Sequence, residues 1–348
     1  MSPTKTSVPG LYFTRDLGWT HVRNARSHGR LVKIRRGVSA LPLPQHSSPW
    51  EAERRQAFMM MAAVADALHV NFVFGFASAA LLHGLGAVPW DGRAHVIQRH
   101  RQGRWRAAGL HHHWGFWDED EVTVINGYPV TSITRTVLDC AVYLPPDWAL
   151  GVADAGLRRL ADMSRFHRVE SSAREQIVRA GLMERLGDRK RAKGIVKARN
   201  VLACADGFAE SLPESRMRCI ALAGGLPPPT CQMPIKTVDG LRYPDLAWPM
   251  ATLTGDLDDP RILAEEYDGV EKYAPEDAAS PAAVLNRQAR RDESLRLANV
   301  HVRHRGARDI ESPSVLFESM VRRFPPCVVS SLQPRPSLLP LDPTLRAG

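Results

Sequence analysis

The sequence predicts a multidomain α/β protein, and three observations support this class. The chain has 348 residues, enough for two or three domains, and its 44% hydrophobic content is ordinary for proteins that bury a core. Segments in which apolar residues recur with helical spacing alternate with short strand-like segments. A Pro/Ser-rich stretch, residues 42–49, separates a basic N-terminal segment from the rest. We therefore expect a small N-terminal unit followed by larger α/β domains.

The first 40 residues are strongly basic. They contain eight Lys or Arg residues and one acid, Asp16, and so supply seven of the nine net positive charges of the chain. An excess of this kind suits a protein that contacts the phosphates of DNA. The candidate DNA contacts are Arg23, Arg26, Arg30, Lys33, Arg35 and Arg36.

The order of elements in this segment predicts a winged helix over residues 1–45. Gly18 breaks a short first helix, and Thr20 can cap a second helix. A basic strand over 31–38 follows and leads to a turn at Gly37. In a winged helix the second helix enters the major groove and the wing contacts phosphate. A basic amphipathic arm is the alternative interpretation.

Residues 46–145 predict a mixed α/β domain, and residues 146–205 a helical connector. The expected elements of the α/β domain are a helix over 49–68, a short helix over 78–84, strands over 94–98 and 110–114, and a helix through 137–142 that Thr131 caps.

The first 142 residues contain an ordered set of motifs. These are Thr14, Gly29, residues 35–38, residues 77–85, residues 130–132 and residues 135–139. In this order they resemble the N-terminal part of AbiEi-like type IV antitoxins. The resemblance implies a winged helix joined to an α/β domain, transcriptional repression of a toxin operon, and a cognate toxin gene product or operator as partner. The residues themselves also allow a structural role, since Arg135 and Asp139 have the spacing of a helical ion pair.

Acidic residues in the C-terminal region follow a pattern that suits a metal site. Glu214 lies at the start of a predicted helix, and Asp245 precedes an apolar strand. Residues 261–269 predict a core strand whose alternation places Glu266 and Asp268 on one face and Glu265 on the other. Acids converging from a helix start and two strands would form an oxygen-rich site for Mg²⁺. Such an ion could bind a scissile phosphate and activate water.

The same region resembles the very-short-patch-repair-like branch of restriction-type endonucleases. Residues 206–310 contain the motifs, which are Asp206, residues 214–215, residues 227–229, Gln232, residues 245–249, residues 266–269 with Tyr273, Arg290, Asp292 and the strand 300–303. The resemblance implies a mixed sheet flanked by helices, with Asp245 and Glu266 as metal ligands and Glu214 and Asp268 in support. Lys236, Lys272 or Arg290 could supply a catalytic cation. Residues 311–348 would form a partly flexible C-terminal extension.

Rival interpretations remain open. The endonuclease-like fold could be inactive, since Glu214 and Arg218 have the spacing of a helical ion pair. The chain would then be an antitoxin-like transcriptional repressor. A structural nucleoid protein or a partner-binding protein is a third possibility. The oligomeric state is left open.

The remaining residues argue against other classes of site. The five cysteines form no CxxC pair and indicate reduced thiols. The run His111-His112-His113 disfavours a zinc site, because adjacent strand residues point to opposite faces. His301 and His304 indicate a basic surface, with a catalytic His301 as the alternative. No apolar run reaches the length of a membrane span, and residues 1–10 do not resemble a signal peptide, so we expect a cytoplasmic protein.

Overall fold

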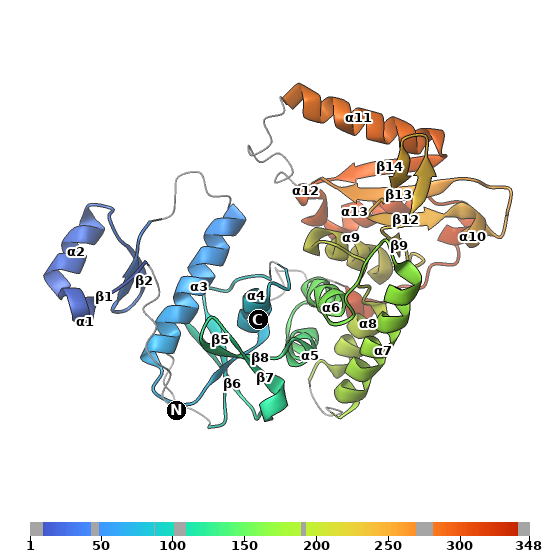
Figure 1. Ribbon diagram of the computed structural model, residues 1–348. Coiled ribbons are helices and arrows are strands. Elements are labelled where there is room, and N and C mark those ends of the chain that lie inside the picture. Colours follow the sequence, from blue (N-terminus) through green and yellow to red (C-terminus); the bar gives the residue numbers. More distant parts are fainter. Residues whose placement is uncertain are drawn as a thin grey trace. The chain divides into compact units, whose positions relative to one another are not determined.

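The computed structural model describes residues 10–42, 49–86, 88–100, 109–188, 193–268 and 281–339. The chain divides into two compact units, Met1–Cys140 and Ala141–Gly348. Helices and strands are mixed in both units, so the predicted α/β class is confirmed (Figure 1). Within the described residues, no helix combines the length and apolar character needed to cross a membrane.

The first unit begins with two short helices and a small sheet. The elements are β1 (Leu11–Phe13), α1 (Thr14–Leu17), α2 (Trp19–Ser27), β2 (Val32–Arg35) and β3 (Val38–Ala40). Gly18 separates the two helices with a φ of 78°, in the left-handed region that glycine favours. The antiparallel sheet has the order β1-β3-β2. Val22 and Ala25 of α2 and the nearby Leu31 are buried, and Arg26 of α2 bonds to Ser39 of β3.

A second sheet of five strands follows in the same unit. The elements of this part are α3 (Pro49–Ala67), β4 (Val73–Phe74), α4 (Phe76–His83), β5 (Ala94–Gln98), β6 (Leu110–Trp114), η1 (Glu119–Glu121), β7 (Val122–Ile125), β8 (Tyr128–Thr131) and α5 (Ile133–Tyr143), which runs past the boundary at Cys140. The strand order is β6-β5-β4-β8-β7, with β5 and β6 parallel. The ion pair expected between Arg135 and Asp139 is present at 2.9 Å. The predicted helices and strands of residues 49–142 are therefore found, within a few residues of their expected bounds.

The second unit begins with helices and continues into a four-stranded sheet. The helices are α6 (Pro146–Leu160), α7 (Arg168–Gly187), α8 (Ile195–Cys204) and α9 (Leu212–Ala223). The sheet contains β9 (Thr230–Cys231), β12 (Leu246–Pro249), β13 (Ile262–Tyr267) and β14 (Val300–Arg305) in the order β14-β13-β12-β9. β13 and β14 are parallel and the other pairs antiparallel. A separate hairpin consists of β10 (Ile235–Thr237) and β11 (Gly240–Arg242).

Helices cover both faces of this four-stranded sheet (Figure 1). The remaining elements are α10 (Met250–Thr254), α11 (Pro281–Leu297), α12 (Ala307–Ile310), α13 (Pro313–Val321), α14 (Pro326–Val329) and η3 (Pro336–Leu338). On one face, α9, α13 and α14 pack around the fully buried Trp248. On the other face, Leu295 of α11 packs against Ala264 and Val300.

The segment expected to be a partly flexible extension contributes to this core. Leu316, Met320 and Val328 are buried in it, and Leu338 is fully buried. The backbone N–H groups of Gln333 and Arg335 donate to the carbonyls of Gly225 and Ala223. Residues 311–339 therefore belong to the packed second unit, while 340–348 lie outside the described residues.

Candidate functional site

Four of the six candidate DNA contacts are exposed on the first unit. Arg23 lies on α2, Arg30 follows it, and Lys33 and Arg36 belong to the β2–β3 hairpin. The guanidinium of Arg23 lies 4.5 Å from the ring centroid of the exposed Trp19. α2 and the hairpin thus carry positive charge on groups that solvent reaches, as phosphate contact requires.

The other two candidates, Arg26 and Arg35, are held by contacts within the unit. Arg26 donates to Ser39 Oγ at 2.7 Å and to the carbonyl of Val38 at 3.3 Å. Arg35 donates to the carbonyl of Ala63 in α3 at 3.2 Å, and its partial burial lowers its pKa. A β-bulge between Lys33 and Arg35 breaks the strand alternation here. Both arginines therefore stabilise the fold of this segment.

In the second unit, Gln232 connects two of the predicted acids. Its side-chain Nε2 donates to Asp245 Oδ1 at 3.1 Å and lies 3.4 Å from Glu214 Oε2. All three side chains are buried. Gln232 has a φ of 47°, in the left-handed region that costs a residue with a Cβ on the order of 1–3 kcal/mol. Such strain persists only where the surrounding structure imposes it, and it is concentrated at functional sites.

The carboxylates of Glu214 and Asp245 repel each other when both are charged. Burial, and then the nearby charge of Asp245, raise the pKa of Glu214 from 4.5 to about 7. Arg218, which helical spacing offered as a partner for Glu214, bonds instead to Asp154 of α6 at 2.6 Å. Glu214 is bonded through Oε2 to the backbone N–H of Glu210 at 2.8 Å. A cation bound beside Glu214 and Asp245 would therefore be favoured.

Glu266 lies on the strand next to Asp245. β12 and β13 pair with Leu246 opposite Glu265, and the backbone N–H of Tyr267 donates to Asp245 Oδ2 at 2.8 Å. Glu266 is buried and forms an ion pair with Arg291 of α11 at 2.7 Å. The structure thus brings Asp245 and the strand segment carrying Glu266 into direct contact.

Asp268 faces α11 and β14. Its Oδ2 lies 2.9 Å from His304 Nδ1 and accepts from Gln288 Nε2 at 3.1 Å. His304 Nε2 lies 3.1 Å from Asp292. Glu265, on the opposite face, pairs with Arg305 at 2.5 Å. The predicted alternation of β13, with Glu266 and Asp268 on one face and Glu265 on the other, is therefore confirmed.

Sequence reasoning missed Arg291, whose guanidinium pairs with Glu266. Of the cations that the sequence suggested, Arg290 and Lys236 are exposed, and Lys272 lies outside the described residues. Helical spacing could have revealed Arg291, because Gln288, Arg291 and Leu295 follow i, i+3, i+7 and all face the sheet. His301 is exposed, and its backbone carbonyl accepts a bond from Arg323.

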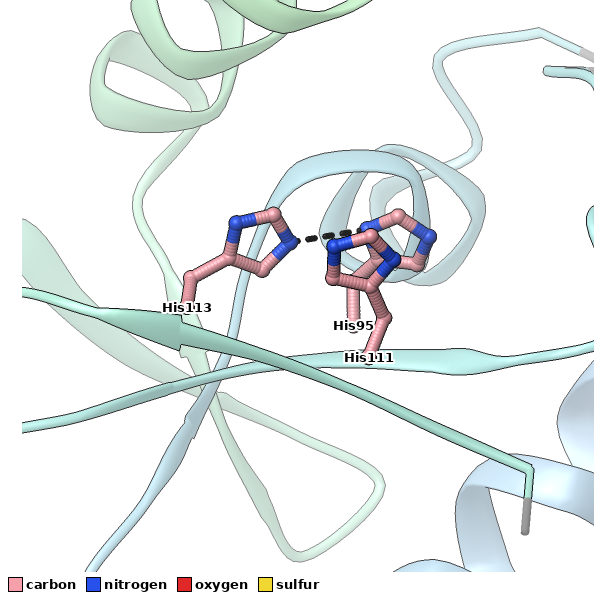
Figure 2. Close-up of side chains that lie close together, drawn as sticks. All are labelled: His95, His111 and His113. Carbon is pink, nitrogen blue, oxygen red and sulfur yellow. Dashed lines mark hydrogen bonds between the residues drawn. The ribbon is translucent and has the colours of Figure 1, made fainter. Parts of the chain in front are cut away.

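A cluster of potential metal ligands lies in the first unit, where the sequence disfavoured a metal site. Within the described residues, His95, His111 and His113 form the one set of three or more potential ligands whose ligand atoms all lie within 4.8 Å of one another (Figure 2). Because adjacent strand residues point to opposite faces, His112 is directed away from the other two histidines of β6. His111 and His113, two residues apart, share a face, and β5 adds His95 opposite His111. Strand pairing, which the sequence did not reveal, assembles the cluster.

The three imidazoles are close together in a partly buried environment. His95 Nδ1 and His113 Nε2 are 3.0 Å apart, and the rings of His111 and His113 stack at 4.5 Å. Burial and then the neighbouring His95 lower the pKa of His113 to about 2 and lower that of His111. The neutral form of both rings is therefore favoured.

The chain matches no protein-family model. Two curated relatives, the uncharacterized proteins MT2308 and Rv2248 from two strains of Mycobacterium tuberculosis, are each 32% identical over 167 residues, 48% of this chain and 51% of the relative. The chain spans about half the length of these curated relatives. The crystal structure of the RV2827C protein from Mycobacterium tuberculosis is matched at 17% identity with a TM-score of 0.31, over 56% of this chain and 76% of that chain.

Proposed function

We propose that this chain binds DNA through its N-terminal unit and hydrolyses DNA phosphodiester bonds with Mg²⁺ at the acidic site of its C-terminal unit. The observation that carries the proposal is the buried set Glu214, Gln232 and Asp245 beside Glu266 on the neighbouring strand. Close carboxylates buried with one pKa raised to about 7 indicate a site arranged for a cation.

The donor set fits Mg²⁺. This ion prefers oxygen ligands and is usually bound by one or two carboxylates together with water and substrate phosphate. Asp245 and Glu266 would hold the ion, and Glu214 would support it. A bound Mg²⁺ would polarise the phosphate and lower the pKa of a water molecule.

The protein's own residues would stabilise the reacting phosphate. Arg291 provides a guanidinium beside Glu266, at 2.7 Å. A positive charge at this place can offset the negative charge that develops on the phosphate oxygens in the transition state. Gln232 orients Asp245 through its 3.1 Å hydrogen bond.

DNA binding would use the exposed cations of the first unit. Arg23, Arg30, Lys33 and Arg36 lie on α2, its C-terminal end and the β2–β3 hairpin, in the order expected of a winged helix. We assign phosphate contact to these four. Arg26 and Arg35 keep the hairpin attached to α2 and α3.

A second candidate function is transcriptional repression without cleavage. It is favoured by the bonds that already occupy the acids, since both oxygens of Asp245 accept hydrogen bonds and Glu266 is paired with Arg291. In that case the C-terminal site would be structural. The partner would be an operator, as the resemblance to AbiEi-like antitoxins implies.

Cleavage by acid variants separates the two functions. Metal-stripped protein is mixed with supercoiled plasmid, mismatched duplex or single-stranded DNA, and Mg²⁺ or Mn²⁺ is then added. We expect strand breaks with wild-type protein and with Asp239→Asn, which changes an exposed acid of the β10–β11 hairpin. Asp245→Asn and Glu266→Gln should not cut, because they keep shape but remove the charge that binds the ion.

The stability of Asp245→Asn provides a second readout. If the acids are kept for a metal, removing one charge relieves repulsion with Glu214, and stability stays equal or rises. If Asp245 is structural, the weakened hydrogen bonds should cost about 1–3 kcal/mol. A destabilised Asp245→Asn together with no cleavage by wild-type protein would leave repression as the function.

A further inference from the structure

We propose that His95, His111 and His113 form a binding site for a transition-metal ion, with Zn²⁺ as the ion that their chemistry fits best. The site is separate from the acidic site, since it lies on β5 and β6 of the first unit. It requires neither DNA binding nor the proposed hydrolysis. Figure 2 shows the three imidazoles on one side of the two strands.

The distances are close to those of a metal centre. At Zn–N distances of about 2.0–2.1 Å, tetrahedral ligand nitrogens lie about 3.4 Å apart. His95 Nδ1 and His113 Nε2 are 3.0 Å apart, and all three ligand atoms lie within 4.8 Å of one another. The three rings stack at interplanar angles of 12–28°, so they would tilt on binding until their lone pairs meet on one ion.

The backbone holds the three side chains in place. β5 and β6 are parallel with His95 opposite His111, so His111 and His113 project on the same face as His95. The backbone N–H of His95 donates to Ser78 Oγ of α4 at 2.8 Å. Because the ligands come from paired strands, the cluster is largely arranged before any ion binds.

Asp91 provides the outer partner that metal-binding histidines commonly have. Its Oδ2 lies 3.5 Å from His95 Nε2 and 3.8 Å from His111 Nδ1. His95 thus directs Nδ1 toward His113 and Nε2 toward a carboxylate. A carboxylate on the far nitrogen fixes the tautomer and orientation of a ligand imidazole.

The backbone at Phe76, beside the histidine cluster, is strained. Its φ is 53°, a left-handed conformation unusual for a bulky residue. The Phe76 ring stacks on that of His113 with centroids 3.7 Å apart. The preceding Gly75 leaves no room for a Cβ, which would lie 2.7 Å from Ile97 Cδ1. The strained backbone therefore places an aromatic wall against one ligand, and such strain is concentrated at binding sites.

The ligand set determines the class of ion. Three imidazoles suit Zn²⁺ and neighbouring divalent ions of the first transition row, whereas Mg²⁺ and Ca²⁺ require oxygen. Three histidines leave a fourth tetrahedral position for water or another ligand. The ion would also join β6, an edge strand, to β5.

Metal binding by the full chain tests the proposal, and His112 offers a matched control. It lies between two of the ligands on β6 but faces the other side of the sheet. Metal-stripped protein is titrated with Zn²⁺ by calorimetry and with Co²⁺ by visible absorption. We expect wild-type protein and His112→Gln to bind one equivalent more than His111→Gln or His113→Gln. The Co²⁺ spectrum should show the intense bands of a four-coordinate nitrogen-ligated ion, and Asp91→Asn should bind roughly 10- to 100-fold more weakly.

Thermal unfolding shows whether each variant is folded. His111 is the most accessible of the three ligands, with a side chain 25% exposed, so His111→Gln should keep a cooperative transition. Zn²⁺ should raise the Tm of wild-type protein and of His112→Gln, and should not raise that of His111→Gln. The proposal is overturned if wild-type protein binds no such equivalent of Zn²⁺, or if His112→Gln loses it as fully as His111→Gln does.

Discussion

At the scale of single residues, Gln232 determines how the acidic site is arranged. Its strained backbone, with a φ of 47°, directs one amide toward both Asp245 and Glu214. The amide orients the two carboxylates but does not neutralise them, so the energy of the site depends on their protonation. Stability measured against pH should report this dependence.

Metal-free protein should lose stability as pH rises from about 4.5 to about 7. The folded-state pKa of Glu214, about 7, lies above its ordinary 4.5, so the folded state favours the proton. That contribution is fully present below pH 4.5 and is lost as pH rises through 7. At about 1.4 kcal/mol per pKa unit, the loss is about 3 kcal/mol. Denaturant unfolding in EDTA should show this decline in wild-type protein and a flatter profile in Glu214→Gln. Equal slopes in the two proteins would contradict the assigned pKa.

Arg35 and Arg36 of the β2–β3 hairpin should differ in effect, the first on stability and the second on DNA affinity. Arg35→Ala removes a hydrogen bond to the carbonyl of Ala63 and should cost roughly 1–2 kcal/mol of unfolding free energy. Arg36 is exposed, so Arg36→Ala should change stability by less than about 0.5 kcal/mol. It should instead lower the slope of log affinity against log salt by about 0.9. Fluorescence anisotropy at several salt concentrations measures that slope, and an unchanged slope would exclude Arg36 from the proposed DNA contacts.

At the scale of elements, sequence periodicity predicted what lies within one strand or helix. The alternation of β13 correctly separated Glu266 and Asp268 from Glu265, because side-chain direction in a strand depends only on local geometry. Strand pairing depends on the whole fold. The sequence therefore could not place His95 opposite His111, and the histidine cluster was missed.

The C-terminal segment shows a second limit of local reasoning. Its seven prolines after residue 311 indicated an extension, yet residues 331–339 pack against the end of α9. Prolines end helices but do not prevent burial of the residues around them. Leu338, fully buried, is the clearest case.

A glycine pair can test this packing. Gly225 and Gly255 both have positive φ, 94° and 76°, so alanine at either position should cost about 1–2 kcal/mol. A Cβ at Gly225 would lie 2.5 Å from the carbonyl carbon of Gln333, whereas one at Gly255 meets no atom within 4 Å. Gly225→Ala should therefore cost roughly 1–3 kcal/mol more than Gly255→Ala in denaturant unfolding. Equal costs would mean that residues 331–339 do not pack there.

At the scale of the whole molecule, composition predicted the class of fold and the place of the charge. Length and hydrophobic content indicated a multidomain α/β chain, as the structure has it. The basic excess of residues 1–40 predicts DNA contact, and this stays a prediction. Charge counts could not show that Arg26 and Arg35 are held by contacts within the first unit, because those contacts come from tertiary packing. We propose that DNA capture and DNA hydrolysis belong to different units.

This division is tested by measuring the cleavage rate against DNA concentration, with Mg²⁺ present, for wild-type protein and two variants. The triple variant Arg23→Ala, Lys33→Ala, Arg36→Ala should need more DNA for half-maximal rate, increasingly so at higher salt, and should keep its kcat. Asp245→Asn should bind DNA as wild-type protein does and cut none of it. The two units do not divide these roles if the triple variant cuts limiting DNA as fast as wild-type protein, or if Asp245→Asn still cuts when Mg²⁺ is present.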